Sequence, residues 1–190
     1  MQMSWRKDQG KDQFFQKAKE ENYRSRAAYK LLEIQAKFRL ISRSSVVLDL
    51  GCAPGGWLQV VKKLTDAAVY GIDLQAIIPI PGVNFGQFDF FDEEQLAGFI
   101  PEEIDAILSD MSPKITGDRT GEHIQSIQML LSCAELAKNR NAKWFIFKLI
   151  AGGREQQVIS QLRRDWNISI FKPKASRSES REIYLVCSKK

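Results

Sequence analysis

The sequence VVLDLGCAPGGW, residues 46–57, decides the fold, because a short apolar run leads into a glycine-rich turn and the start of a helix. A short apolar run bounded by turn residues is typical of a buried strand in a parallel sheet. Gly51, Gly55 and Gly56 let the backbone approach a ligand where a Cβ atom would collide. The spacing is not G-x-G-x-x-G, the pattern of a pyrophosphate-binding turn. The stretch therefore predicts a pocket for a cofactor with an adenosine but no phosphates, and S-adenosylmethionine fits that description.

Outward from this turn, apolar runs and helical patterns alternate along the chain. The alternation predicts an α/β fold with a mostly parallel sheet. We expect strands at 46–50, 68–73, 83–88, 104–109, 143–149, 167–171 and 182–188, and helices at about 57–64, 123–138 and 155–164. A further helix before the first strand has Ser25 as its N-cap and an apolar face of Ala27, Leu31, Ile34 and Phe38.

The composition bounds the class of protein. A chain of 190 residues with 44% hydrophobic residues is one ordinary domain with a core. No apolar run reaches the length of a membrane span, and the first residues lack the apolar segment of a signal peptide, so we expect a cytoplasmic protein that binds no membrane. Cys52, Cys133 and Cys187 are too few and scattered for a disulfide framework or a zinc site. The single histidine, His123, is expected at the surface, and no metal site is predicted.

The charges are distributed in three blocks. Residues 1–45 carry 11 Lys and Arg against 5 Asp and Glu, residues 46–136 carry 4 against 14, and residues 137–190 carry 13 against 4. This layout predicts a central pocket for a small cation and two flanks that face a polyanion. A solvated surface with a chance bias remains the alternative.

Aspartates stand at the ends of three successive predicted strands. In open α/β sheets, ligands bind beyond the carboxyl ends of the strands. Asp73 lies 22 residues after Gly51, close to the spacing of about 20 residues at which an acidic residue bonds ribose hydroxyls. Asp89 is placed to accept from an adenine amino group beside the Phe90 ring, and Asp110 ends the next strand. The alternative is that these aspartates cap the helices that follow them.

Five motifs, in order, resemble those of the FtsJ-like 2′-O-ribose RNA methyltransferases. They are RSRAAYKL (24–31), DLGCAPGGW (49–57), SDMSP (109–113), FKL (147–149) and SRSESREIY (176–184). The resemblance covers nearly the whole chain. It implies a single Rossmann-like methyltransferase domain over 1–190, with the catalytic core at 23–190, and the basic residues of 1–22 predict an N-terminal arm that is ordered in part at most. It also implies a seven-stranded, mostly parallel sheet with the last strand antiparallel and helices on both faces.

The same resemblance implies the functional residues. Its catalytic tetrad corresponds to Lys30, Asp110, Lys148 and Glu182, and its S-adenosylmethionine contacts to Gly55, Trp57, Asp73, Asp89 and Asp110. Our hypothesis is that Lys148 is the general base, because the ribose hydroxyl must lose a proton as it attacks. Asp110 would orient Lys148, while Lys30 and Glu182 position the ribose. Taken alone, Lys148 reads as a strand lysine that reaches solvent, and Trp57 as a core residue.

The basic flanks are predicted to bind RNA phosphates. The residues that we expect to do so are Arg24, Arg26, Lys172, Lys174, Arg177 and Arg181. The resemblance implies a monomeric enzyme that methylates RNA, and we favour a uridine of large-subunit ribosomal RNA as its substrate. Three alternatives stay open: a transfer-RNA anticodon-loop methyltransferase of the same family, a non-catalytic RNA-binding or ribosome-assembly module, and a Rossmann dehydrogenase, which the missing phosphate motif disfavours.

Overall fold

Seven strands form one sheet in the computed structural model, which describes residues 12–113, 116–177 and 179–190. The strand order is β3-β2-β1-β4-β5-β7-β6. Neighbouring strands from β3 to β5 are parallel, whereas β7 is antiparallel to both β5 and β6. The strands are β1 (Val47–Leu50), β2 (Val69–Asp73), β3 (Val83–Gln87), β4 (Ala106–Ser109), β5 (Trp144–Ile150), β6 (Trp166–Phe171) and β7 (Glu182–Lys189). This arrangement confirms the predicted sheet, and each strand end lies within two residues of its prediction.

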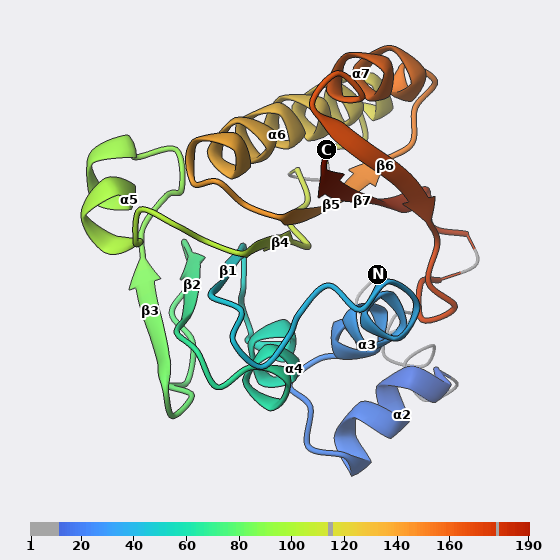
Figure 1. The fold of residues 1–190 in the computed structure, drawn as a ribbon. Coiled ribbons are helices and arrows are strands. Elements are labelled where there is room, and N and C mark those ends of the chain that lie inside the picture. Colours follow the sequence, from blue (N-terminus) through green and yellow to red (C-terminus); the bar gives the residue numbers. More distant parts are fainter. Residues whose placement is uncertain (1–11, 114–115, 178) are drawn as a thin grey trace.

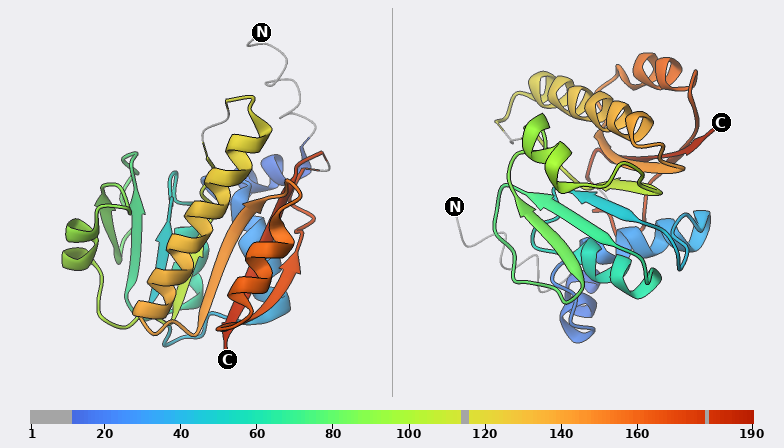
Figure 2. Two further views of the ribbon diagram at one scale, coloured as in Figure 1. Left: turned by 90° about the horizontal axis from the view of Figure 1, so that it is seen from above. Right: turned by 60° about the vertical axis from the view of Figure 1, so that its left-hand side comes forward.

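Helices cover both faces of the sheet (Figure 1), as predicted. One face carries α6 (Arg119–Asn139) and α7 (Glu155–Leu162), and the other carries α3 (Ala27–Phe38) and α4 (Gly56–Leu64). The short helix α5 (Glu93–Phe99) lies beside the β3 end of the sheet, and α2 (Gln13–Glu20) lies outside α3 (Figure 2). Each face buries its own apolar cluster: Leu130 and Ile159 belong to the first, and Leu31 and Leu58 to the second.

The sheet topology fixes where a ligand binds. The strand order reverses between β1 and β4, and the carboxyl ends of these strands meet at one edge. Because β7 runs antiparallel, its first residue lies at this same edge, where Glu182 pairs with Ile150 at the end of β5. Side chains from the end of β4, from β5 and from the beginning of β7 therefore converge.

The N-terminal region differs from one expectation. Residues 12–22 of the predicted arm are ordered, because α2 is capped by the Asp12 carboxylate and Asp12 pairs with Arg26 at the start of α3. The remainder of the predicted arm, residues 1–11, lies outside the described residues. Ser25 does not cap α3, since the N-cap is Arg26 without a side-chain bond. The Ser25 hydroxyl instead lies against Gly56, where a Cβ atom would be 2.3 Å from Oγ.

The sequence pattern predicts no helix at the position of α5, and α6 begins before its predicted first residue. Both helices start at an aspartate N-cap, Asp92 for α5 and Asp118 for α6.

Among the residues described, no helix is long and apolar enough to span a membrane.

Candidate active site

A pocket of about 370 Å³ lies at the carboxyl edge of the sheet, over the ends of β1, β2 and β4. Its lining combines three carboxylates with apolar and aromatic side chains, and none of the lining residues that the structure describes is basic. They are Gly51, Ile72, Asp73, Leu74, Gln75, Phe88, Asp89, Phe90, Phe91, Asp110, Met111, Ser112 and Met129. We call this the donor pocket. Such a lining suits a positively charged ligand with a flat ring and opposes a diphosphate.

The predicted strand-end aspartates meet in the donor pocket. The Asp73 carboxylate accepts from the backbone N–H groups of Ala53 and Gln75, each at 2.8 Å, and this fixes its orientation. Asp89 accepts from the N–H of Phe91 at 3.1 Å. Neither residue caps a helix, because Asp92 and Asp118 do so. The alternative role that the sequence left open for Asp73 and Asp89 is therefore absent.

The glycine turn forms one wall of the donor pocket. Gly51 has a φ of +71°, and a Cβ atom there would lie 2.1 Å from Cγ of Met111, so only glycine fits without a shift. Gly55, Gly56 and Trp57 do not line the pocket, and their predicted cofactor contacts stay predictions. Trp57 is a core residue in this structure: its indole N–H donates to the carbonyl of Ala27 at 2.7 Å, and its ring packs against Tyr184.

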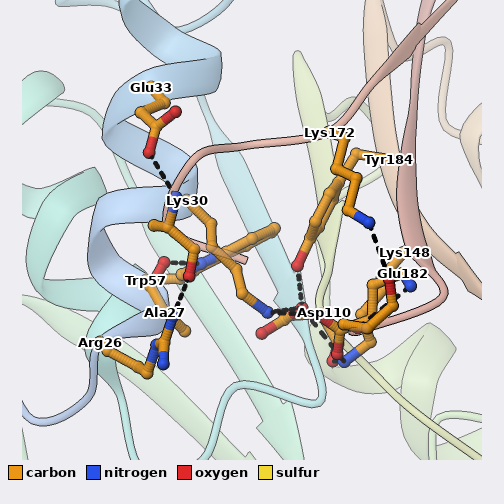
Figure 3. A network of polar contacts seen from close by, with 12 residues as sticks. Arg26, Ala27, Lys30, Glu33, Trp57, Asp110, Lys148, Lys172, Glu182 and Tyr184 are labelled. Atoms are coloured by element: carbon orange, nitrogen blue, oxygen red, sulfur yellow. Dashed lines mark hydrogen bonds and ion pairs between the residues drawn. The ribbon is translucent and has the colours of Figure 1, made fainter. Parts of the chain in front are cut away.

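Four charged side chains gather beside the donor pocket, as predicted (Figure 3). Lys148 Nζ lies 3.1 Å from Oδ1 of Asp110 and also donates to the Asp110 backbone carbonyl. Lys30 Nζ lies 3.1 Å from Oε2 of Glu182 and 3.7 Å from Oδ1 of Asp110. Lys148 Nζ is 3.8 Å from Oε1 of Glu182. The two lysines are buried, and the two carboxylates between them balance their charge.

A second pocket, of about 510 Å³, is lined in part by residues of the tetrad. Lys30 and Glu182 line it, whereas Asp110 lines the donor pocket. Its remaining lining residues are Ser25, Arg26, Ala27, Ala175, Arg177, Glu179 and Ser180. We call it the acceptor pocket. The tetrad thus contributes to the lining of an acidic, partly aromatic pocket and of a pocket that contains two arginines.

Comparison with known proteins gives this arrangement a family. Residues 23–190 match the family described as FtsJ-like methyltransferase. The chain belongs to the FtsJ-like methyltransferases. The ribosomal RNA large subunit methyltransferase E of Rickettsia akari is 39% identical over 200 residues, which span 98% of this chain and 88% of the relative. That of Methanothrix thermoacetophila is 39% identical over 185 residues, 94% of this chain and 72% of the relative.

A solved structure is similar as well. The crystal structure of a ribosomal RNA methyltransferase from Plasmodium falciparum superposes with a TM-score of 0.75 at 31% identity, over 88% of this chain and 98% of that one. The predicted family and fold are confirmed, and an FtsJ-like methyltransferase requires a methyl donor.

One residue that the sequence analysis missed bonds to the tetrad of this FtsJ-like enzyme. The Tyr184 hydroxyl donates to Oδ1 of Asp110, the oxygen that also faces both lysines. Burial, with the Asp110 carboxylate nearby, raises the pKa of Tyr184 well above its usual value, so the hydroxyl keeps its proton. The sequence contained a signal: along a strand, Tyr184 shares a face with Glu182. In the sheet it stands opposite Lys148.

A fully buried carboxylate of the FtsJ-like chain lies beneath the donor pocket. Asp49, in β1, has an Oδ2 atom with no hydrogen-bond partner among the described residues. Burial and the nearby carboxylates of Asp110 and Asp73 raise the pKa of Asp49 well above its usual value. An uncharged Asp49 is the form that such surroundings favour.

The residues predicted to bind RNA differ in their surroundings. Lys174 and Arg177 are exposed, and Arg26 is half-buried between Asp12 and the carbonyl of Ala175. Lys172 donates to the carbonyl of Ser180, and Arg181 to that of Ala151. The Arg24 guanidinium bonds three backbone carbonyls, those of Pro54, Ile78 and Pro79.

The expected surface position of His123 is wrong. His123 is buried at 2% exposure, its Nδ1 lies 2.7 Å from the carbonyl of Ile150, and its Nε2 accepts from the N–H of Arg154 at 3.3 Å. A Cβ atom on Gly152 would lie 2.5 Å from Cγ of His123. The imidazole thus packs under the turn that follows β5, which a one-dimensional pattern does not reveal.

Proposed function

We propose that this FtsJ-like methyltransferase uses S-adenosylmethionine to methylate the 2′-hydroxyl of a ribose in RNA, and that its substrate is a uridine of large-subunit ribosomal RNA. The observation that carries the proposal is that the Lys30–Asp110–Lys148–Glu182 tetrad contributes to the lining of two pockets, one acidic and one that contains two arginines. An acidic pocket favours a cationic methyl donor, and a pocket with arginines favours a phosphate-bearing acceptor.

The residues of the donor pocket fit S-adenosylmethionine. Asp73, held by two backbone N–H groups, keeps lone pairs free for ribose hydroxyls. Asp89 and Phe90 would hold the adenine, and Asp110 would favour the positive charge of the donor. When bound, S-adenosylmethionine supplies an electrophilic methyl group.

Lys148 is suited to receive the proton of the attacking hydroxyl. Its ammonium nitrogen is held by the backbone carbonyl and the carboxylate of Asp110 and by Glu182, so that its direction is fixed. Once Lys148 has released its own proton, the free lone pair on Nζ takes the proton of the ribose 2′-hydroxyl. Holding the base at a fixed site contributes much of the rate through orientation alone.

Lys30 and Glu182 line the acceptor pocket, and this supports a role in positioning the ribose. Lys30 can donate to a ribose oxygen, while Glu182 can accept from a hydroxyl. Arg26 and Arg177 in the same pocket, with Lys172, Lys174 and Arg181 nearby in sequence, would contact phosphates. The relatives from Rickettsia akari and Methanothrix thermoacetophila are named ribosomal RNA large subunit methyltransferases, and the similar solved structure is titled a ribosomal RNA methyltransferase.

The test is a map of 2′-O-methylated nucleotides. Purified protein and S-adenosylmethionine are incubated in separate reactions with large ribosomal subunits, with naked ribosomal RNA and with total transfer RNA. We expect one new 2′-O-methyl uridine in large-subunit RNA and none with Asp110→Ala. Modification of a transfer-RNA anticodon loop, or of no RNA at all, would contradict the proposal. The proposal includes a monomeric enzyme in the cytoplasm, and light scattering of the purified protein checks the first of these.

A further inference from the structure

Arg24 lies at the junction of two loops that border the donor pocket. Its Nη1 atom donates to the carbonyl of Pro54 at 3.1 Å and to that of Ile78 at 2.5 Å, and its Nη2 donates to the carbonyl of Pro79 at 3.2 Å. Pro54 belongs to the glycine turn, whereas Ile78 and Pro79 belong to the segment that follows β2. One guanidinium group therefore connects two segments that are distant in sequence.

Both of these segments hold Asp73. The Asp73 carboxylate accepts from Ala53, the neighbour of Pro54, and from Gln75, at the beginning of the segment that leads to Ile78. Leu74 and Gln75 themselves line the donor pocket. The bonds of Arg24 and those of Asp73 thus close a ring around this side of the pocket, with Arg24 on the outside and Asp73 on the inside.

The backbone of Arg24 is anchored independently of its side chain. Its N–H donates to Oε1 of Gln59 in α4 at 2.8 Å, and the Gln59 amide donates to the carbonyl of Asn22 at 2.9 Å. The guanidinium lies over Gly55, where φ is +105° and a Cβ atom would be 2.8 Å from Nη1 of Arg24. Gly55 therefore leaves the space that the Arg24 side chain occupies.

We propose that Arg24 is a positioning residue for the methyl donor, which joins the glycine turn to the segment 74–80, and that this role replaces the RNA contact predicted from the sequence. A planar guanidinium with several donors in fixed directions can bond carbonyls on two sides at once, which a lysine ammonium cannot reproduce. Three of its bonds are already made inside the protein, so that fewer donors are left for a phosphate. The proposal rests on the proposed function for the identity of the donor, but the connection between the two loops does not.

Arg24→Lys separates the two roles, because it keeps the positive charge and loses the geometry. The first measurement is hydrogen exchange, in the free protein, of the backbone amides of Ala53 and Gln75, which donate to Asp73, and of Val83, which donates to the carbonyl of Ile80. We expect exchange about tenfold faster or more in Arg24→Lys than in wild type, since each lost bond to a charged group lowers the opening free energy. Arg177→Lys, the same substitution at an exposed arginine, should leave the exchange rates of these amides unchanged. Unchanged exchange in Arg24→Lys would overturn the proposal.

The second measurement determines the affinity for S-adenosylmethionine by calorimetry and the affinity for RNA by titration. For Arg24→Lys we expect a Kd for S-adenosylmethionine at least about tenfold higher, while the affinity for RNA and its salt dependence stay as in wild type. Normal donor affinity in Arg24→Lys, together with weaker RNA binding in Arg24→Ala, would assign Arg24 to the RNA and overturn the proposal. If wild type bound no S-adenosylmethionine, the proposed function would fail, and the exchange rates would still decide the role of Arg24. Circular dichroism confirms that each variant is folded.

Discussion

Replacement of Tyr184 by phenylalanine removes one hydrogen bond from the centre of the site. The lost bond joins a fully buried hydroxyl to the Asp110 carboxylate. A hydrogen bond to a charged group contributes about 1.5–3 kcal/mol to stability. The loss stays near the middle of this range, about 2 kcal/mol, because Lys148 and Lys30 still lie 3.1 and 3.7 Å from Oδ1 of Asp110 and leave no unpaired charge.

Thermal unfolding measures this cost. In a domain of this size, 1 kcal/mol lowers the Tm by about 2–4 °C, so Tyr184→Phe should unfold about 4–8 °C below wild type. Tyr23→Phe is the matched control, since the same atom is removed from an exposed bond to Lys63, and it should change stability by less than about 0.5 kcal/mol. Equal losses in the two variants, or none in Tyr184→Phe, would show that the bond from Tyr184 to Asp110 does not stabilise the fold.

The same substitution has a bounded effect on methyl transfer. A loss of about 2 kcal/mol corresponds to at most about 30-fold in kcat, and the pH–rate profile should keep its shape because the Tyr184 hydroxyl does not titrate in the working range. Complete loss of activity in a folded Tyr184→Phe protein would show that the tyrosine itself moves the proton.

Two further predictions concern the glycine turn and the carboxylate beneath it. Gly51→Ala forces a Cβ atom against Met111 at positive φ, so we expect a destabilised protein with weaker donor binding. Gly98→Ala, inside α5 with no atom within 4 Å of its Cβ position, should instead be more stable by about 0.5–1 kcal/mol. Chemical denaturation measures the free energy of unfolding of both variants, and a change of the same sign in both would contradict this prediction. Because burial raises the folded pKa of Asp49 above its ordinary value of 3.8, its contribution to stability is present in acid and is lost as the pH rises from about 4 toward the raised pKa. The stability of Asp49→Asn relative to wild type should therefore increase between pH 4 and pH 8, and a constant difference would show that Asp49 is ionised in the folded protein.

The positions of the strands along the chain were predictable because each strand has its own apolar run. Runs such as Val47–Leu50 and Trp144–Ile150 are mostly apolar and are buried on both faces, as central parallel strands are. The short helix Glu93–Phe99 was missed because only Leu96 of its seven residues is buried, which leaves almost no apolar periodicity. The helix Gln13–Glu20 was missed because the contacts that hold it, Tyr29 with Phe14 and Arg26 with Asp12, are made by residues from another part of the chain.

The tetrad was predicted by resemblance, and its geometry was not. Nothing local in the sequence indicates that Arg24 bonds Ile78 or that His123 lies under the turn after β5, since both contacts join residues more than 25 positions apart. From the sequence alone, such polar side chains are expected at the solvated surface. The strand period does link Tyr184 to Glu182, and this signal was available in the sequence.

In the proposed function, Lys148 accepts the proton of the ribose hydroxyl. The most direct measurement compares Lys148→Ala with wild type in two assays on the same preparation: the Kd for S-adenosylmethionine by calorimetry, and the rate of single-turnover 2′-O-methylation of large-subunit RNA. We expect nearly unchanged donor binding, because Lys148 does not line the donor pocket, and no detectable methyl transfer. Methylation by Lys148→Ala at a rate close to that of wild type would rule out Lys148 as the base.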